Sequence, residues 1–509
     1  MLDSLPSGAG CLCQGTGTRG RKDTRTMDER GRKQRMKKGF DNDKYLKMQS
    51  EHIRERISQF DNKLYLEFGG KLYDDYHASR VLPGFEPDSK LRMLMQLADQ
   101  VEIVIVISAE DIEKNKVRGD LGITYDSDLL RLKAVFESKN LYVGSVCITH
   151  FAGQYSAQMF QSRLEKMGVK VYRHYLIPGY PNNIPLIVSE DGYGHNEYIE
   201  TTKPLVVVTA PGPGSGKMAT CLSQLYHEHK RGVRAGYAKY ETFPIWNLPL
   251  SHPVNLAYEA ATADLNDVNM IDPYHLEAYG KTTVNYNRDV EIFPVLKAIF
   301  MHIYGDCPYQ SPTDMGVNMA GNCIVDDEVC RQASCQEIIR RYYHTLVNIA
   351  RGKAKEEEAY KIELLMNKAG VTTQDRKVVE AALKRAEETG HTAAAMELPD
   401  GRLITGKTSD LMGACSALLI KALKELAGID KDVPLITPNV IMPIQKLKVN
   451  YLGSRNPRLH MEEVLIALSA SSESNELADL ALKQLPRLRG SQVHTSRMLS
   501  DTDEKTFQK

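Results

Sequence analysis

The amino-acid sequence predicts a multidomain α/β protein. We expect a parallel-sheet α/β body with a P-loop-like strand–turn–helix, followed by a helical segment and a C-terminal α+β domain. The β-branched runs at 101–108 and 142–149 are typical of strands buried on both faces of a parallel sheet. A third run, 205–209, leads through a glycine-rich turn into a helix expected over 218–230. A chain of 509 residues is also too long for one hydrophobic core.

Composition excludes several classes of protein. Lys plus Arg and Asp plus Glu number 65 each, so no global charge attracts nucleic acid or a membrane surface, and we expect neither as a partner. No apolar run approaches the ~20 residues that span a bilayer. The first 38 residues lack the apolar core of a signal peptide, which predicts a cytoplasmic protein. Nine cysteines without zinc-finger spacing predict reduced thiols and no metal site.

The elements of the body follow in order. Residues 1–38 are rich in Gly, Ser, Thr and Arg, which predicts a disordered leader that is dispensable for folding. A helix at 154–167 and a strand at 169–172 complete a strand–helix–strand unit with the run at 142–149. Helical patterns continue over 289–304 and 334–351.

The C-terminal part has its own elements. Residues 394–405 predict a hairpin turning at Asp400 and Gly401, followed by a helix at 411–426 that ends at Gly428. A Pro-rich strand region at 433–449 and a helix at 460–469 complete the expected domain. Two polar helices within 352–389 have too little apolar surface to form a core, so we expect them to pack on a neighbouring domain or a second subunit of a homo-oligomer.

These patterns divide the chain into five segments. We expect a leader (1–38), a first α/β domain (39–203), a second α/β domain with the P-loop-like turn (204–351), a helical segment (352–390) and a C-terminal α+β domain (391–509).

The strongest local motif is Ala210-Pro-Gly-Pro-Gly-Ser-Gly-Lys217, which lies between the predicted strand and helix. In P-loops the glycines let backbone N–H groups surround phosphate oxygens, while a lysine adds charge. We therefore expect a phosphate-binding turn, with candidate cofactor-binding residues Gly212, Gly214, Ser215, Gly216 and Lys217. Two departures matter, since Pro211 replaces the first glycine and Met218 replaces the Ser or Thr that binds magnesium. The alternative is a structural turn that leaves Lys217 solvated.

A second candidate region covers residues 239–289, where polar, aromatic and proline residues fill the expected loops. Loops carried on a rigid sheet are frequent ligand sites. We expect His252, Asp272 and Asp289 as catalytic acid–base groups and Arg288 as a phosphate clamp. The alternative for each residue is that it satisfies loop backbone. Asp314 is either a site residue or a helix cap.

Several long motifs carry a family resemblance. They are Glu67-Phe-Gly-Gly-Lys-Leu-Tyr-Asp-Asp-Tyr-His-Ala-Ser-Arg80, the glycine-rich turn, Val284-Asn-Tyr-Asn-Arg-Asp289, Ser311-Pro-Thr-Asp-Met-Gly-Val-Asn318 and Leu398-Pro-Asp-Gly-Arg402. From about residue 37 the chain resembles the bacterial domain of unknown function family 1846. The resemblance implies an α/β body with added C-terminal domains and no established activity. By analogy, the last domain resembles the opening of cytidine-deaminase-like folds, without their zinc ligands.

Together these patterns favour an enzyme of transferase or ligase type that binds a nucleotide, with or without magnesium, or a phosphorylated metabolite. The alternative is a non-catalytic scaffold or regulatory protein with a structural Gly-rich loop. Met218 favours the alternative, whereas the polar loops favour the enzyme.

Overall fold

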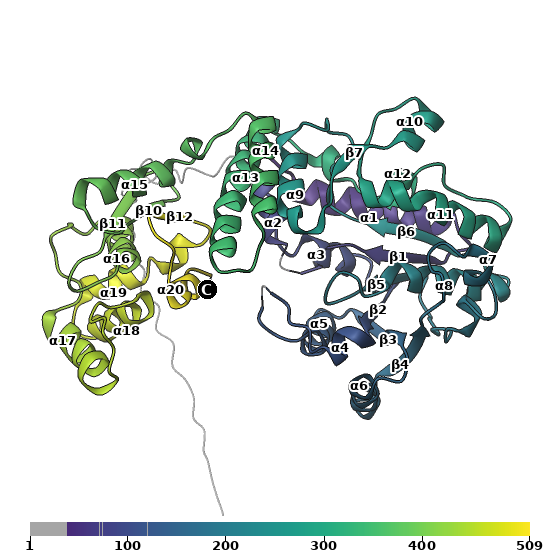
Figure 1. Ribbon diagram of the computed structural model, residues 1–509, viewed down its shortest axis with the longest axis horizontal. Helices are drawn as coiled ribbons and strands as arrows, with labels where there is room; N and C mark the ends of the chain where they lie inside the picture. Colours follow the sequence, from purple (N-terminus) through teal and green to yellow (C-terminus); the bar gives the residue numbers. More distant parts are fainter. Residues whose placement is uncertain (1–37, 71, 74, 120, 509) are drawn as a thin grey trace, which may run out of the picture. The chain divides into compact units, whose positions relative to one another are not determined.

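The structure is a computed structural model that describes residues 38–508 except 71, 74 and 120 (Figure 1). The predicted leader lies outside the described residues but for residue 38. Within the described part, no helix is both long and apolar enough to cross a membrane.

A seven-stranded, wholly parallel sheet forms the body. The strand order is β4-β3-β2-β5-β1-β6-β9. The strands are β1 (Leu64–Phe68), β2 (Val101–Ser108), β3 (Tyr142–Phe151), β4 (Lys170–Tyr175), β5 (Leu205–Thr209), β6 (Gly236–Tyr240) and β9 (Gly316–Val317). β1, β2 and β5 are buried along their whole length, as a sheet covered on both faces requires. This confirms the α/β class and three predicted strands.

The strand order changes the expected domain division. β5 pairs with β1 on one side and with β2 on the other. The two segments expected as separate α/β domains, 39–203 and 204–351, therefore share one sheet. Without β5, strand β1 has no hydrogen-bonded contact with β2, so the strands of the first segment do not form one continuous sheet by themselves.

The topology also marks a crevice. From β2 the chain moves outward to β3 and β4, whereas from β5 it crosses β1 to reach β6 on the opposite side. Neighbouring strands whose connections leave in opposite directions form a topological switch point, and ligands of open α/β sheets bind there, outside the carboxyl ends of the strands. In this sheet that point lies between β2 and β5.

Helices cover the sheet, and a small hairpin of β7 (Asn269–Ile271) and β8 (Val284–Tyr286) is added. The helices are α1 (Asn42–Ser58), α2 (Tyr76–Val81), α3 (Ser89–Met95), α4 (Ala109–Glu113), α5 (Tyr125–Ser138), α6 (Tyr155–Lys166), α7 (Ile184–Ile187), α8 (Lys217–Lys230), α9 (Pro253–Ala261), α10 (Pro273–Tyr279), α11 (Asn287–Tyr304), α12 (Pro312–Met315), α13 (Asp327–Ala350) and α14 (Glu356–Ala369). α13 packs on α9, α14 and α2. Half of the predicted helical segment, α14, thus belongs to the body.

The other half, α15 (Lys377–Thr389), packs on a separate antiparallel sheet ordered β11-β10-β12. Its strands are β10 (Ala393–Glu397), β11 (Leu403–Lys407) and β12 (Gln492–Thr495), and β10 and β11 form the predicted hairpin. The helices that follow are α16 (Ala414–Ala427), α17 (Pro438–Lys446), α18 (Met461–Ser472), α19 (Glu476–Leu482) and α20 (Asp501–Gln508). α16 ends at Gly428, whose φ of 68° is the predicted left-handed cap.

The strand predicted within 433–449 is wrong, because α17 occupies 438–446. Pro438 stands in the first turn of α17, where its fixed φ suits a helix and its missing N–H costs nothing. Of the prolines in this region, Pro438 therefore starts the helix and Pro443 lies within it.

Candidate functional site at the carboxyl edge of the sheet

Charged and glycine residues gather where the central strands end. Glu67 in β1 is in register with Lys239 in β6 and with Val208 in β5. Because Val208 lies two residues before the glycine-rich loop, that loop emerges next to the Glu67–Lys239 pair. The two segments that the sequence singled out, the 210–217 loop and the 239–289 region, thus start from the same edge of the sheet.

The glycine-rich loop is a tight turn held by hydrogen bonds within the loop and from the end of β3. Gly214 and Gly216 have φ values of 73° and 84°, a left-handed conformation that suits glycine. The Ser215 hydroxyl donates a hydrogen bond to the Gly212 carbonyl (2.6 Å). The Thr149 hydroxyl, at the end of β3, donates to the Ser215 carbonyl (2.7 Å). The turn therefore keeps its shape without a ligand.

Carbonyl groups of this turn accept hydrogen bonds, but its backbone N–H groups do not donate any to a described residue. None of the residues that the structure describes accepts a backbone hydrogen bond from Gly214, Ser215, Gly216 or Lys217. Lys217 itself is half-buried and forms no ion pair within the described chain. Unpaired N–H groups, a helix N-terminus and a free ammonium group together favour an anion.

A cavity of about 180 Å³ opens beside the first turn of α8. Its walls come from the ends of β3 and β4, from the segment between β4 and β5, and from α8, and they include Thr149, His174, Tyr180, Tyr193, Gly216 and Thr220. More of the wall is apolar than polar, which suits the uncharged part of a small molecule.

Two hydroxyl groups in this cavity lack partners. Tyr193 and Thr220 are fully buried, and neither hydroxyl has a hydrogen-bond partner among the described residues. Their nearest polar neighbours are the Tyr180 hydroxyl and the Cys147 thiol, respectively, which act on them as hydrogen-bonding groups without reaching full hydrogen-bond geometry. A buried polar group left unpaired costs about 1–3 kcal/mol, so a ligand or a water molecule that supplies the missing bond gains that free energy.

Two histidines add polar groups to the cavity. Burial lowers the pKa of His174 to about 4, so its imidazole is neutral at neutral pH. Its Nε2 lies 3.1 Å from the Glu197 carbonyl oxygen, which can only accept; Nε2 therefore carries the proton and Nδ1 is an acceptor. His150 has a φ of 52°, and such conformations in residues other than glycine are often stabilised at functional sites.

On the other side of the edge lies a charged cluster. The Lys239 ammonium contacts both carboxylate oxygens of Asp289 (2.6 and 2.7 Å), the Tyr286 hydroxyl (2.5 Å) and the Glu241 carboxylate (3.0 Å). Burial lowers the pKa of Lys239, but Asp289 and Glu241 outweigh burial and hold that pKa above its usual value. Lys239 is therefore a fixed cation here.

The second carboxylate of the cluster is different. Burial raises the pKa of Glu241 to about 7, with Asp289 adding to the rise and Lys239 opposing it. The Tyr286 hydroxyl donates a hydrogen bond to this carboxylate. A carboxyl group that titrates near neutral pH can both donate and accept a proton under cellular conditions.

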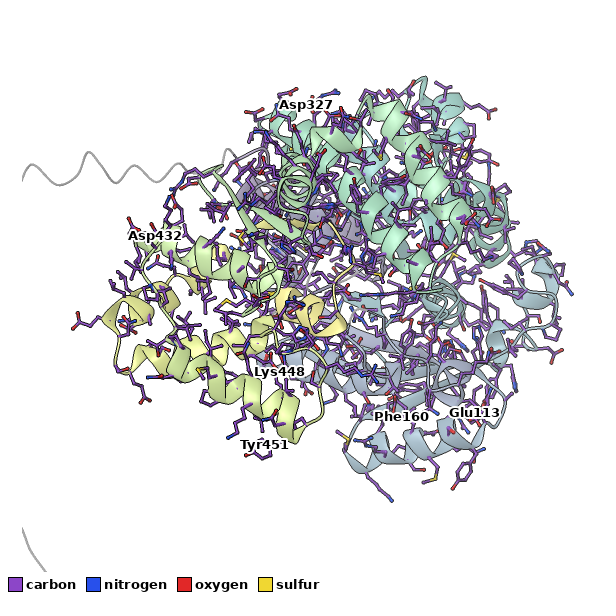
Figure 2. The ribbon with its side chains drawn as sticks, turned by 60° about the vertical axis from the view of Figure 1, so that its left-hand side comes forward. Glu113, Phe160, Asp327, Asp432, Lys448 and Tyr451 are labelled. Carbon is purple, nitrogen blue, oxygen red and sulfur yellow. The ribbon has the colours of Figure 1, made fainter. Side chains whose placement is uncertain are left out.

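Two of the predicted catalytic residues make structural contacts. His252 caps α9: its Nδ1 accepts from the Val254 N–H, and its Nε2 lies 2.9 Å from Asp327, a half-exposed residue labelled in Figure 2. Asp272 is fully buried and caps α10, and it also accepts the N–H and the hydroxyl of Thr313. Both side chains satisfy loop and helix backbone, which is the alternative that the sequence left open.

Of the remaining predicted residues, one lies in the charged cluster and the others are paired elsewhere. Asp289 joins the cluster, as described. Arg288 pairs with the buried Asp267 (2.6 and 2.7 Å), so its charge is already neutralised. Asp314 completes a capping box with Ser311 at α12, which is one of the two roles expected for it.

Sequence reasoning missed Glu241, Tyr193 and Thr220 as site residues. Glu241 directly follows a strand, a position that could have revealed it once the strand was placed at the sheet centre. Tyr193 and Thr220 carry no sequence signal, because an unpaired hydroxyl becomes evident only in three dimensions. In the described part of the chain, no group of three or more His, Cys, Asp or Glu residues has an arrangement that could hold a metal ion.

Comparison with known proteins shows the family. Residues 38–370 match the family model described as domain of unknown function DUF1846, N-terminal, and residues 374–509 match its C-terminal counterpart. A UPF0371 protein of Streptococcus thermophilus strain CNRZ 1066 is 58% identical over 473 residues, which cover 93% of this chain and 96% of the relative. A UPF0371 protein of Corynebacterium urealyticum is 58% identical over 470 residues, covering 92% and 95%. The chain therefore belongs to the DUF1846 family, whose curated members are named UPF0371 proteins.

Proposed function

We propose that this protein is an enzyme that binds a nucleotide or another phosphorylated small metabolite at the carboxyl edge of its parallel sheet. The observation that carries the proposal is the cavity beside α8, where Tyr193 and Thr220 present buried hydroxyls that no described residue bonds. Because those groups cost free energy in the free protein, a ligand that hydrogen-bonds to them gains more than it would at an already satisfied surface.

The phosphate group is assigned to the glycine-rich loop. The unpaired N–H groups from Gly214 to Lys217 and the dipole of the 14-residue helix α8 favour negative charge at this point. Lys217 adds a cation that no described residue neutralises. Gly216 borders both the loop and the cavity, so one ligand can place its phosphate on the loop and its apolar part in the cavity.

The chemistry is assigned to the charged cluster. Glu241 is the proton donor or acceptor in this proposal, since its pKa of about 7 allows both roles. Lys239 stabilises negative charge that develops on the reacting group, and Asp289 holds Lys239 in place. This arrangement fits a transferase- or ligase-type reaction of a phosphorylated substrate.

A regulatory binding protein is the second candidate. Met218 favours it, because a thioether cannot bind magnesium as the usual Ser or Thr does. Thr220, the next hydroxyl along the helix, is fully buried in the cavity wall. A ligand that binds but is never converted would support this candidate.

The test is a calorimetric screen of the full chain against nucleotides, sugar phosphates and inorganic phosphate. We expect Lys217→Ala to weaken binding of a hit at least tenfold and to leave stability within about 0.5 kcal/mol, because the lysine has no ion-pair partner in the described chain to lose. Lys166→Ala, an exposed lysine on α6, is the matched control. If no phosphorylated compound binds, or if both variants bind like the wild type, the proposal is wrong.

Tyr193→Phe separates a ligand-binding hydroxyl from a structural one. Removing an unpaired hydroxyl is expected to leave the free energy of unfolding unchanged or to raise it by up to about 1–2 kcal/mol, while it weakens ligand binding. Tyr155→Phe, at a side chain that is 73% exposed, should change neither quantity. A clear loss of stability in Tyr193→Phe would show that this hydroxyl is bonded in the free protein.

A further inference from the structure

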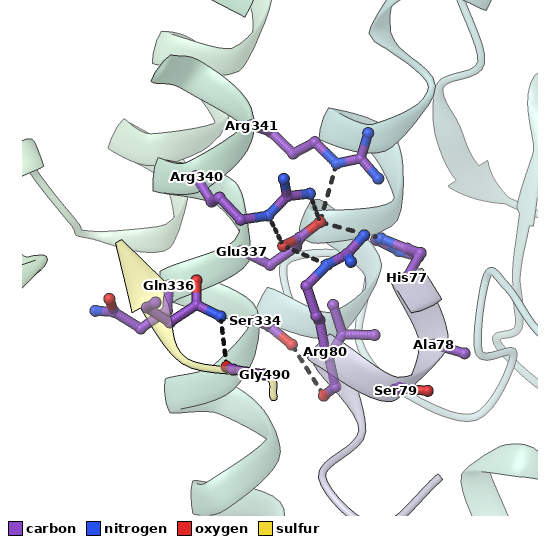
Figure 3. A network of polar contacts seen from close by, with 12 residues as sticks. His77, Ala78, Ser79, Arg80, Ser334, Gln336, Glu337, Arg340, Arg341 and Gly490 are labelled. Atoms are coloured by element: carbon purple, nitrogen blue, oxygen red, sulfur yellow. Dashed lines mark hydrogen bonds and ion pairs between the residues drawn. The ribbon is translucent and has the colours of Figure 1, made fainter. Parts of the chain in front are cut away.

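A buried carboxylate between α2 and α13 collects an unusual number of arginines (Figure 3). Glu337 is only 1% exposed. It accepts hydrogen bonds from the Nε of Arg80 (3.0 Å), from the Nε and Nη2 of Arg340 (2.6 and 2.7 Å) and from the Nε of Arg341 (2.9 Å). These four bonds fill the four acceptor sites that a carboxylate has.

The charges in this cluster do not balance. Three guanidinium groups surround one carboxylate, which leaves a surplus of two positive charges in a half-buried place. Burial lowers the pKa of Arg80 to about 10, and repulsion from Arg340 and Arg341 adds to the effect. Asp264 attracts Arg341 from farther away but forms no ion pair with it.

Several donors of the cluster are also unused. Arg80 and Arg341 each bond Glu337 through Nε alone, and no described residue accepts from their terminal Nη groups. Both side chains reach solvent, with 33% and 23% of their surface exposed. Both ring nitrogens of His77 are buried without a hydrogen-bond partner among the described residues, and Nδ1 stays 3.5 Å from Glu337. The cluster thus offers unused terminal donors from two arginine side chains.

We propose that Arg80 and Arg341 form a second anion site, which binds a phosphate group. A phosphate dianion carries the two negative charges that the cluster lacks, whereas a single carboxylate would neutralise only half of the surplus. Its oxygens also suit the forked guanidinium groups, which bind phosphate through pairs of N–H donors. The residues come from α2 and α13 rather than from β5 and α8, so this site does not rest on the function proposed for the glycine-rich loop.

His77 lies behind Glu337 and forms part of the fixed wall of the cluster. Burial lowers the pKa of His77, so the ring is neutral and has one donor and one acceptor nitrogen. Its edge faces Phe243, with ring centroids 5.2 Å apart, and Phe243 stacks on Tyr258 (5.5 Å, 16° between planes). These aromatic contacts fix the ring beside Glu337.

The test is a calorimetric titration of the full chain with inorganic phosphate at constant ionic strength in chloride buffer. It is performed in the Lys217→Ala background so that the glycine-rich loop does not contribute. We expect saturable binding that Arg341→Ala and Arg80→Gln each weaken at least tenfold. Arg331→Ala, at an exposed arginine of the same helix α13, is the matched control and should bind like the background protein.

The outcomes are separable. Equal phosphate affinity in the background, Arg341→Ala and Arg80→Gln proteins overturns the proposal, as does the absence of saturable binding both to phosphate and to a sugar phosphate. Binding of the sugar phosphate alone supports the site and identifies the anion as part of a larger metabolite. The Lys217→Ala change by itself tests the loop, so failure of one site does not imply failure of the other. Circular dichroism of each variant checks that it is folded. If Arg341→Ala is not folded, Arg341→Gln takes its place.

Discussion

Replacement of Glu337 by glutamine tests the electrostatics of the arginine cluster. The substitution keeps the size of the side chain but removes the negative charge that sits among three guanidinium groups. Breaking a buried ion pair by removing one partner costs about 3–5 kcal/mol. We expect a loss near the lower end, about 3 kcal/mol, because the arginines reach solvent and can partly turn away.

The corresponding shift in Tm follows from the size of the body. Unfolding entropy of about 2.1 cal/mol/K per residue gives roughly 0.7 kcal/mol/K for the residues matched as the N-terminal region, 38–370, and hence a drop of about 4 °C. Scanning calorimetry of both proteins measures it. Glu328→Gln, at an exposed position of the same helix, is the control and should change stability by less than about 1 kcal/mol.

Two further readouts make the reasoning refutable. The arginines hold the pKa of Glu337 well below its usual value, so its contribution is complete above the unfolded pKa of about 4.5 and is lost as the pH falls through the lower folded value. The difference between wild type and Glu337→Gln should therefore shrink below about pH 4.5. With the positive surplus raised to three, the variant should also bind phosphate more tightly. A variant as stable as the wild type at pH 7 would show that the carboxylate does not hold the cluster together.

Four other substitutions have defined outcomes. Thr220→Val keeps the shape of the cavity wall but removes an unpaired hydroxyl, so chemical denaturation should show a gain of about 1 kcal/mol while calorimetry shows weaker ligand binding. Because the pKa of Glu241 is raised in the folded protein, the unfolded chain releases this proton first, and the wild type should lose stability as the pH rises from about 4.5 to about 7. Glu241→Gln should abolish this loss, which denaturation at several pH values measures. Asp289→Asn should lower turnover of a phosphorylated substrate and spare its affinity, because the proposed role of Asp289 is to hold the Lys239 cation; equal turnover in a kinetic assay argues against that role. His252→Ala should lower the free energy of unfolding by about 1–2 kcal/mol through the lost cap, and a loss of ligand affinity at unchanged stability would instead place His252 in the site.

The local hydrophobic pattern of the sequence predicted the strands because every residue of these strands is buried. β2 and β5 are buried at every residue, so their sequences are mostly apolar and β-branched over the length of the strands, with Glu102, Ser108 and Thr209 as buried polar exceptions. The strand order has no such local signal. The insertion of β5 between β1 and β2 joins segments more than 90 residues apart, and a single sequence does not encode those pairings locally.

The candidate site was also predicted only in part from the sequence. The glycine-rich loop was located from the sequence because a strand, a turn and a helix are consecutive in the chain. Asp272 and His252 were predicted as catalytic because polar residues in loops resemble site residues, whereas their hydrogen bonds show that they cap α10 and α9. A carboxylate that fills its bonding capacity with backbone N–H groups cannot be distinguished by residue type from one that faces a ligand.

Both proposed sites share one physical feature, which is hydrogen-bonding groups that have no partner among the described residues. At the cavity it is the hydroxyls of Tyr193 and Thr220, and at the arginine cluster it is the terminal groups of Arg80 and Arg341. Residues that only stabilise the fold should lose stability when they are truncated, as the helix caps should. The unpaired hydroxyls should behave in the opposite way, because their removal relieves a cost in the free protein and weakens binding of the ligand that would have compensated it. Arg80 and Arg341 also pair with Glu337, so their removal loses an ion pair as well. For the hydroxyls, the sign of the stability change, measured together with affinity, therefore separates a binding residue from a structural one even while the reaction is unidentified.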